Sequence, residues 1–188
     1  MQEIQRESME FDVVVVGGGV SGLSCAIRLK QLAIDAGLDE FMVCVVEKGS
    51  EFGAHILSGA VMETRALDEL FPDWQNMNAP ITVKAAEDRV YMLPNAKKAV
   101  KLPSSVVPAS MHNEGNYIVS LGNVVRWLAE QAESMEIMLF PNFTASEILY
   151  NADGSVRGIQ TGDMGVNAKG EPKPSFEAGY ELVAKYTV

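Results

Sequence analysis

Closely spaced glycines follow a run of apolar, mostly β-branched residues near the start of the chain, and this junction constrains the fold more than any other feature. The run Phe11 to Val16 leads into Gly17-Gly18-Gly19-Val20-Ser21-Gly22, in which the first, third and last glycines have GxGxxG spacing. In this motif the first glycine permits a tight strand-to-helix turn, the second lets a pyrophosphate approach the backbone, and the third lets the helix pack on the strand. The N–H groups and dipole at the start of the helix favour phosphate charge.

The residues after the motif provide the context that it needs. Apolar residues at helical spacing predict a helix from Ser21 to about Ala36, and Phe41 to Glu47 predicts a second buried strand. Together they predict a right-handed βαβ unit. Glu47 ends the second strand, 25 residues after Gly22, where an acid accepts hydrogen bonds from the adenosine ribose. The alternative is a glycine turn that only packs, with Glu47 as a solvated strand end. No arginine adjoins Glu47, which argues against a 2′-phosphate and so against NADP.

The remaining chain does not continue as alternating parallel strands and helices. A short helix is expected at 64–70, an irregular segment with short strands near 81–84 and 89–93 fills 76–116, and a second long helix covers 123–135. A strand at 137–140 follows, and then strands at 145–150, 155–161 and 180–188, with a polar loop at 163–177, predict a β-meander. This order favours FAD over NAD as the dinucleotide.

The predicted fold class is therefore α/β, a Rossmann-like FAD-binding βαβ unit with an irregular inserted segment and a three-stranded β-meander. We expect residues 1–10 to form a polar tail and residues 11–188 to form one FAD-binding domain. The chain stops inside a strand pattern, which fits either a sheet strand at the very terminus or an incomplete flavoprotein fold.

Composition narrows the function classes. The 188 residues are 47% apolar with a net charge of −10, which indicates a globular chain and argues against a nucleic-acid partner. Cys25 and Cys44 are the only cysteines, which excludes a disulfide scaffold and a self-contained iron–sulfur site. The longest early uncharged run, Val13 to Ile27, is too short and glycine-rich to span a bilayer, and no secretory signal is visible. The default location is therefore on the cytoplasmic side, with reduced thiols.

Several segments carry a more specific resemblance. The stretches FDVVVVGGGVSGLSCAIRLKQLA, VVEKGSEFGAHILSGAVM, LFPDW, NYIVSLGNVVRWLAEQAE and DGSVRGIQTGDMGVNAKGEPKPSFEAGYEL resemble the electron-transfer flavoprotein–ubiquinone oxidoreductase family. The resemblance implies FAD, a four-iron four-sulfur cluster and a monotopic enzyme, at the cytoplasmic face of a bacterial inner membrane, that passes electrons from reduced electron-transfer flavoprotein to ubiquinone. Members are much longer and carry the cluster cysteines in their later part. Cys25 and Cys44 do not match those ligands. The resemblance therefore implies that this chain is the N-terminal portion of a longer enzyme and is inactive alone.

The same resemblance implies which residues contact the cofactor. No catalytic acid or base is expected, because in electron transfer the chemistry lies on the cofactors. His55 could equally make a purely structural hydrogen bond, and Ser58 could equally be a turn-forming serine. The implied cofactor-binding residues are Gly17, Gly19, Gly22 and Glu47 for ADP, with Lys48 adjacent; Gly53, His55, Ser58 and Gly59 in a loop beside the flavin ring and quinone pocket; Arg126 near the pyrophosphate; and Ala145 near the adenine.

Two segments are candidates for membrane contact. Residues 81–120 contain five basic and three acidic side chains, a net charge of +2, among apolar residues, although a solvated loop is the favoured explanation of this segment. The resemblance favours Glu51 to Phe71 instead, with Phe52, Ile56 and Leu57 exposed. Trp74 and Trp127 are expected to be core residues rather than cofactor contacts. Two alternative functions stay open, a flavoprotein of the geranylgeranyl-reductase or aromatic-hydroxylase type and a non-catalytic dinucleotide-binding module.

Overall fold

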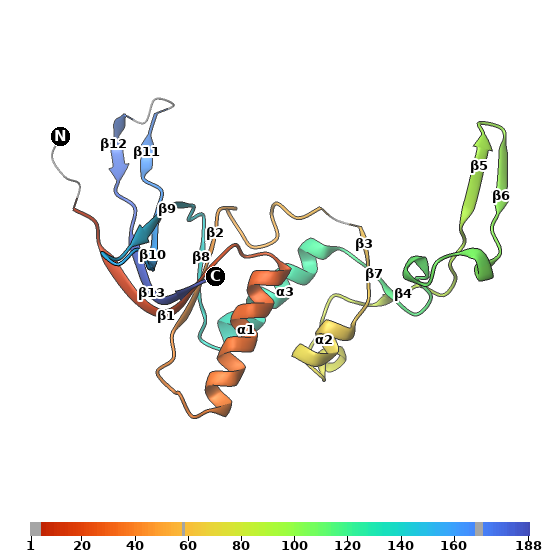
Figure 1. The fold of residues 1–188 in the computed structure, drawn as a ribbon, viewed down its shortest axis with the longest axis horizontal. Coiled ribbons are helices and arrows are strands. Elements are labelled where there is room, and N and C mark those ends of the chain that lie inside the picture. The colour runs from red at the N-terminus through yellow and green to blue at the C-terminus, as the bar shows by residue number, and fades with distance from the viewer. Residues whose placement is uncertain (1–4, 58, 168–170) are drawn as a thin grey trace. The chain divides into compact units, whose positions relative to one another are not determined.

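The computed structural model describes residues 5–57, 59–167 and 171–188 (Figure 1). The chain forms two compact units. The first comprises Met1–Ile56 and Gly122–Val188, and the second comprises Leu57–Leu121. The segment 76–116, which the sequence marks as irregular, lies entirely in the second unit.

A six-stranded mixed sheet forms the centre of the first unit. Four of its strands run parallel side by side, and the last two are antiparallel to their neighbours. In spatial order the strands are β8 (Met138–Pro141), β2 (Val43–Glu47), β1 (Ser8–Val16), β13 (Glu181–Thr187), β10 (Val156–Thr161) and β9 (Ala145–Tyr150).

Two helices connect the parallel strands. Helix α1 (Val20–Asp35) joins β1 to β2, and α3 (Leu121–Ser134) precedes β8 in the chain. Because β1, β2 and β8 follow one another in one direction across the sheet, right-handed connections place both helices on the same face. The buried side chains of α1 include Leu23, Ala26 and Ile27, and those of α3 include Trp127, as predicted. The predicted βαβ unit is confirmed.

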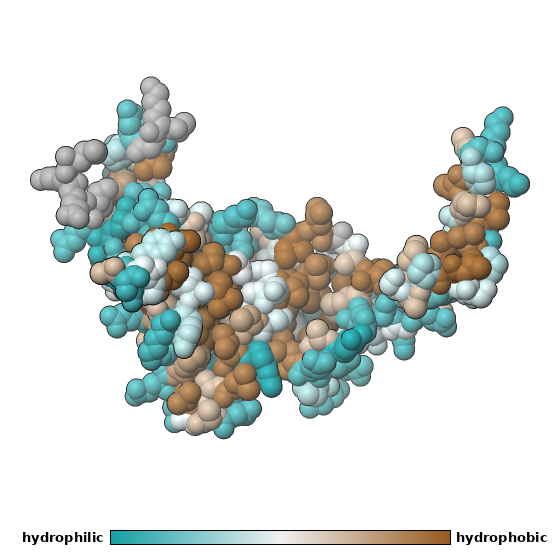
Figure 2. All heavy atoms as spheres, in the orientation of Figure 1, coloured by the Kyte–Doolittle hydropathy of each residue, from teal (hydrophilic) through white to brown (hydrophobic). Residues whose placement is uncertain are grey.

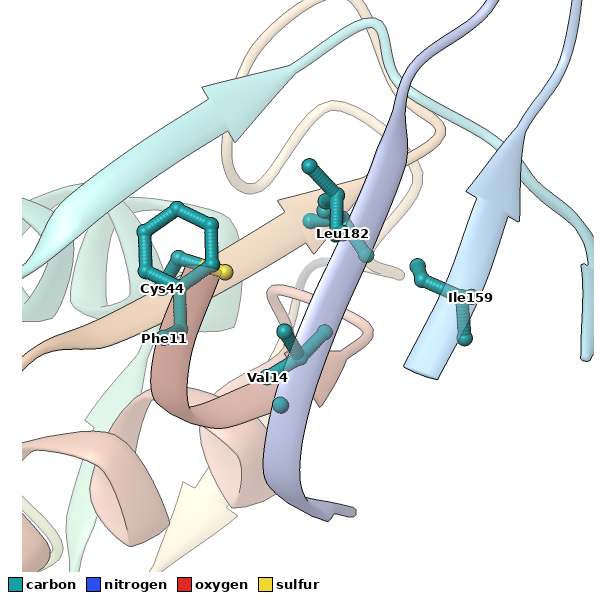
Figure 3. Close-up of a cluster of buried hydrophobic side chains, with 7 residues drawn as sticks. Phe11, Val14, Cys44, Ile159 and Leu182 are labelled. Carbon is teal, nitrogen blue, oxygen red and sulfur yellow. The ribbon is translucent and has the colours of Figure 1, made fainter. Parts of the chain in front are cut away.

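The opposite face of the sheet carries a second apolar cluster (Figure 3). Phe11 and Val14 both belong to it, although three positions along a regular strand would place them on opposite faces. The carbonyl of Met42 accepts hydrogen bonds from the N–H groups of both Asp12 and Val13, at 2.9 and 3.2 Å, so the backbone departs from regular pairing with β2 between Phe11 and Val14. The strands are therefore apolar on both faces, as the unbroken run of β-branched residues predicts.

Strand β13 joins the two halves of the sheet. The antiparallel order β9, β10, β13 confirms the predicted meander, but β13 also runs parallel to β1, with Ser8 opposite Glu181. This pairing extends β1 back to Ser8, so that residues 8–10 belong to the sheet and the predicted polar tail is shorter than expected. The segment 163–177, expected to be a loop, instead contains the hairpin of β11 (Met164–Val166) and β12 (Pro172–Glu177).

The second unit is built from small elements. A three-stranded antiparallel sheet contains β3 (Ala60–Met62), β7 (Tyr117–Val119) and β4 (Val83–Lys84), and a separate hairpin contains β5 (Tyr91–Asn95) and β6 (Lys98–Lys101). Helix α2 (Arg65–Leu70) confirms the predicted short helix, and single 3₁₀ turns cover Trp74–Asn76, Ser104–Val106 and Ala109–Met111. Trp74 is buried as predicted, with its edge against the ring of Tyr117 and its indole N–H donating to Asp68 at 2.6 Å.

An ion pair fastens the start of the chain to the meander. Arg6 donates to both carboxylate oxygens of Asp163, and the backbone N–H of Gly179 donates to the same carboxylate at 2.8 Å. Both side chains are largely buried. The hydrogen bonds from Arg6 and Gly179 hold the pKa of Asp163 below its usual value, because they favour the ionised carboxylate.

We expect Asp163→Asn to lower the free energy of unfolding by about 2 kcal/mol at pH 7, because it removes charge-assisted hydrogen bonds. A lowered folded-state pKa stabilises the fold above the unfolded-state pKa, about 3.9, and this contribution is lost as the pH falls through the folded-state value. The difference from wild type, measured by urea unfolding, should therefore narrow below about pH 4. Glu133→Gln, on the exposed face of α3, is the control and should change stability little at any pH. A pH-independent difference for Asp163→Asn would contradict the prediction.

Candidate functional site

The turn between β1 and α1 has the geometry that the glycine motif requires. Gly17 adopts a φ of +108°, which side-chain-bearing residues rarely adopt, and its N–H donates to the carbonyl of Val46 at 2.8 Å. A Cβ on Gly22 would lie 2.0 Å from the Gly17 carbonyl oxygen, so only glycine allows α1 to start this close to β1. A Cβ on Gly19 would meet no atom within 4 Å. The space in front of Gly19 is thus open for a ligand.

The first turn of α1 faces this open space. Its leading N–H groups have no partner within the helix, and no side chain caps them. Free N–H groups and the positive end of the helix dipole suit a phosphate. The residues present therefore fit the pyrophosphate of a dinucleotide.

Glu47, the last residue of β2, is held by two backbone groups. One carboxylate oxygen accepts from the N–H of Gly18 at 2.9 Å, and the other accepts from the N–H of Gly49 at 2.7 Å. These bonds orient the carboxylate, and each oxygen keeps further lone-pair capacity. The side chain is neither a freely solvated strand end nor fully buried. It can accept hydrogen bonds from a pair of ribose hydroxyls.

A pocket of about 190 Å³ lies beside this carboxylate. It brings together four of the predicted site residues, Gly17, Glu47, Lys48 and Ala145, from segments far apart in the sequence. The connection from β8 to β9 closes one side, because Phe143 donates its backbone N–H to the carbonyl of Glu47 at 2.9 Å. The remaining lining residues are Val16, Val46, Phe143 and Thr144. The pocket thus adjoins the glycine turn on the side where an adenosine would follow the phosphates of a bound dinucleotide.

The loop after β2 packs on the start of α3. Gly53 has a φ of +86°, and a Cβ on it would lie 2.6 Å from the carbonyl oxygen of Gly122. Arg126 donates to Glu51 in this loop and to Asn123 on its own helix, both at 3.0 Å. In this structure Gly53 has a packing role, and Arg126 reaches the loop that follows Glu47.

The other described loop residues of the predicted site, His55 and Gly59, do not line the pocket beside Glu47. His55 is exposed near Gly49, Gly59 has a φ of +87° and lies in the second unit, and Ser58 lies outside the described residues. The expectation of an exposed Phe52 is wrong: its side chain is only 7% exposed, because the ring packs against Gly18. Leu57, by contrast, is 90% exposed, as expected.

The two cysteines lie in the βαβ unit, Cys25 on α1 and Cys44 on β2. Burial raises the pKa of the Cys44 thiol to about 12, which keeps it protonated and unreactive. Among the described residues, no group of three or more His, Cys, Asp and Glu side chains is arranged to hold a metal ion. In the same ranges, no helix is both long and apolar enough to cross a membrane.

Comparison with known proteins identifies the glycine turn and gives the chain its relatives. Residues 15–71 match the family model of the NAD(P)-binding Rossmann-like domain. A probable electron transfer flavoprotein-ubiquinone oxidoreductase of Acinetobacter baylyi is 58% identical over the whole chain, and the enzymes of Pseudomonas aeruginosa and Mus musculus are 57% and 48% identical over 98% of it. The chain is similar along its whole length to electron transfer flavoprotein–ubiquinone oxidoreductases. It spans about a third of their length, covering their N-terminal part, and the resemblance found in the sequence is confirmed.

Solved structures show the same fold in flavin enzymes. A geranylgeranyl bacteriochlorophyll reductase-like protein of Thermoplasma acidophilum aligns with 96% of this chain and 38% of its own, at a TM-score of 0.63 and 19% identity. The flavin-dependent monooxygenase PieE, solved with FAD and substrate, aligns with 96% of this chain and 30% of its own, at a TM-score of 0.61 and 14% identity. The Rossmann-like FAD-binding α/β fold predicted from the sequence is confirmed.

Three residues from outside the βαβ strands and the glycine motif contribute to the site and were not predicted from the sequence. Phe143 and Thr144 line the pocket beside Glu47, and Phe52 covers Gly18. Only Phe52 has a signal in the sequence, a third glycine at position 18 where the GxGxxG pattern accepts any residue. Phe143 and Thr144 follow Pro141 in a connection without periodicity, and the fold alone places them at the pocket.

The second and third motif glycines should respond differently to alanine. We expect Gly19→Ala to lower the free energy of unfolding by about 1 kcal/mol or less, the cost of alanine at a helix N-cap where the new methyl meets no atom. It should nevertheless bind FAD at least tenfold more weakly, since the methyl occupies the phosphate approach. Gly22→Ala should lower stability by several kcal/mol, on the order of a severe overpacking. Thermal unfolding and FAD titration of both variants check this. Equal losses of stability in the two variants would refute it.

Proposed function

We propose that this chain is the FAD-binding part of a membrane-associated oxidoreductase that passes electrons from reduced electron-transfer flavoprotein to ubiquinone. The observation that carries the proposal is the identity of 46–58%, over nearly the whole of this chain, to enzymes of that name. The glycine turn and Glu47 of the chain also fit a dinucleotide. The four-iron four-sulfur cluster and the cytoplasmic face of the inner membrane are further parts of the proposal that come from the resemblance.

The residues of the site bind and orient. The open face of Gly19 and the first turn of α1 would hold the pyrophosphate, Glu47 would accept the ribose hydroxyls, and Lys48 and Ala145 would border the adenosine. FAD, when bound, supplies the electron-accepting and electron-donating ring. We expect Arg126 to add positive charge near the phosphates, within reach of the loop that carries Glu51. No side chain of the described site needs to transfer a proton.

The two alternative functions have weaker support. The likeness to a geranylgeranyl bacteriochlorophyll reductase-like protein rests on 19% identity, which shows the fold alone. A non-catalytic dinucleotide-binding module would share the glycine turn, but it would not account for the match of the other segments along the whole chain. A quinone-reduction assay separates the proposed function from both alternatives, and NADPH oxidation separates the reductase or hydroxylase from the non-catalytic module.

Glu47→Ala in the full-length protein should weaken FAD binding by about tenfold or more, because a charge-assisted hydrogen bond to the ribose is lost. With FAD restored to saturation, ubiquinone reduction by reduced electron-transfer flavoprotein should recover, since Glu47 has no part in electron transfer itself. FAD titration and the quinone assay check both parts. Unchanged FAD affinity would contradict the assignment of Glu47. Wild-type protein that binds FAD but reduces no quinone would contradict the proposed reaction.

The hairpin of β5 and β6 is the surface that we propose for membrane contact. Tyr91, Met92 and Leu93 are exposed, Leu93 at 72%, and Lys97, Lys98 and Lys101 lie in or beside the opposite strand. Figure 2 shows apolar residues along this hairpin, with hydrophilic ones at its tip. Exposed apolar side chains beside lysines suit the interface of an anionic bilayer. The hairpin thus supports the first of the two candidate segments, residues 81–120, more strongly than 51–71.

Leu93→Asp should reduce binding to vesicles that contain anionic lipid by about tenfold, because it places a charge where an apolar side chain would enter the interface. Leu38→Asp, at a residue 53% exposed in the first unit, is the matched control and should bind like wild type. Vesicle co-sedimentation at low and high salt measures both. Equal binding of the two variants would exclude the hairpin as the contact surface.

A further inference from the structure

Gly18 is a glycine that the dinucleotide motif does not require. It occupies a variable position of GxGxxG, and its backbone is not among those with positive φ. A Cβ at this position would lie 2.2 Å from Cε1 and 2.4 Å from Cδ1 of Phe52, and 3.0 Å from Cβ of Glu47. Position 18 therefore holds a residue without a side chain because the Phe52 ring lies directly against it.

The Phe52 ring is held firmly in this place. Its side chain is 7% exposed, and the next residue, Gly53, packs backbone to backbone on Gly122 at the start of α3. The preceding residue, Glu51, pairs with Arg126 of the same helix at 3.0 Å. The loop is thus attached to α3 on both sides of Phe52.

Gly18 in turn orients the acid of the site. Its N–H donates to one carboxylate oxygen of Glu47 at 2.9 Å, while the Gly49 N–H donates to the other. If the Gly18 peptide shifts, the direction of its N–H changes, and a hydrogen bond weakens steeply when it departs from linearity. The ring, the Gly18 peptide and the carboxylate therefore form one continuous set of contacts.

We infer that Phe52 is a positioning residue, whose ring presses the Gly18 peptide against Glu47 and so sets the direction in which that carboxylate meets the ribose. The inference rests on the proposed function, because it assigns Phe52 a role through the ribose acceptor of the dinucleotide site. Phe52 acts through Gly18 and Glu47, so its effect should appear in ribose recognition rather than in phosphate binding.

ADP and 2′-deoxy-ADP are the probes that separate this role from packing alone. For the flavin-free full-length protein we expect ADP to bind at least tenfold more tightly than 2′-deoxy-ADP, since the latter lacks one hydroxyl that Glu47 accepts. Phe52→Leu should bring this ratio close to one, because the carboxylate is no longer held in direction. If the role of Phe52 is merely structural, Phe52→Leu will lower the stability of the protein and leave the ADP to 2′-deoxy-ADP affinity ratio unchanged.

Phe11→Leu is the matched control. Phe11 is 6% exposed, nearly the same as Phe52, and lies in the apolar cluster on the other face of the sheet, away from the glycine turn. We expect Phe11→Leu to lower the midpoint of thermal unfolding about as much as Phe52→Leu does, and to keep the wild-type ratio between the two nucleotides. If both variants lose the preference for ADP over 2′-deoxy-ADP to the same extent, the inference is overturned.

A second pair of variants keeps the test valid if Phe52→Leu folds poorly. Gly18→Ala should weaken ADP binding by about tenfold, because its methyl displaces either the ring or the peptide. Combining it with Phe52→Leu should restore part of the affinity, since the smaller side chain makes room for the methyl, and such coupling is expected only between residues in contact. Losses that simply multiply in the double variant would overturn the inference.

The outcomes also separate this inference from the proposed function. Wild-type protein that binds both nucleotides equally would overturn the ribose role of Glu47, and the inference about Phe52 with it. Wild-type protein that prefers ADP, together with Phe52→Leu that prefers it equally, would overturn the role of Phe52 alone. A preference that is lost in Phe52→Leu and retained in Phe11→Leu supports the inference.

Discussion

Strand β1 is hydrogen-bonded along both edges, to β2 on one side and to β13 on the other, and the rest of the first unit depends on this double pairing. On one side it begins the parallel βαβ arrangement that ends at Glu47. On the other it receives the last strand of the meander, and Val188, directly after that strand, exchanges hydrogen bonds with Val14 and Val16. Over Val13–Val16 the strand has partners on both edges, so its end is a rigid base for the glycine turn.

The dinucleotide site is rigid for a related reason. Its groups are backbone atoms or side chains held by backbone atoms: the N–H groups of the first turn of α1, and a carboxylate fixed by Gly18 and Gly49. The loop that follows contributes through packing, because Phe52 and Gly53 connect the glycine turn to the start of α3. A site arranged in this way is largely formed before any ligand arrives, which reduces the ordering cost of binding.

Much of this could be predicted from the sequence, because the relevant signals are local. The run of β-branched residues before the glycines, the helical spacing after them and the acid at the end of the next strand all lie within residues 11–47, and the structure confirms the βαβ unit that they predict. Helix α3 and the antiparallel pair β9 and β10 were likewise visible from periodicity and from a turn sequence at 151–154. The role of individual side chains was harder to predict. Phe52 was expected to be exposed because the family resemblance placed it in a candidate membrane-contact segment, and no periodicity in this loop shows which way a side chain points.

The sequence by itself determined the βαβ unit, the dinucleotide motif and the family resemblance, since each rests on residues close together in the chain or on whole segments. Only the tertiary structure decided that β13 pairs with β1, that Ala145 and Lys48 border one pocket, and that Phe52 covers Gly18. The physical reason is that strand pairing and close packing depend on which surfaces meet in space. A strand pattern shows that backbone groups need partners, but it does not say which distant strand supplies them.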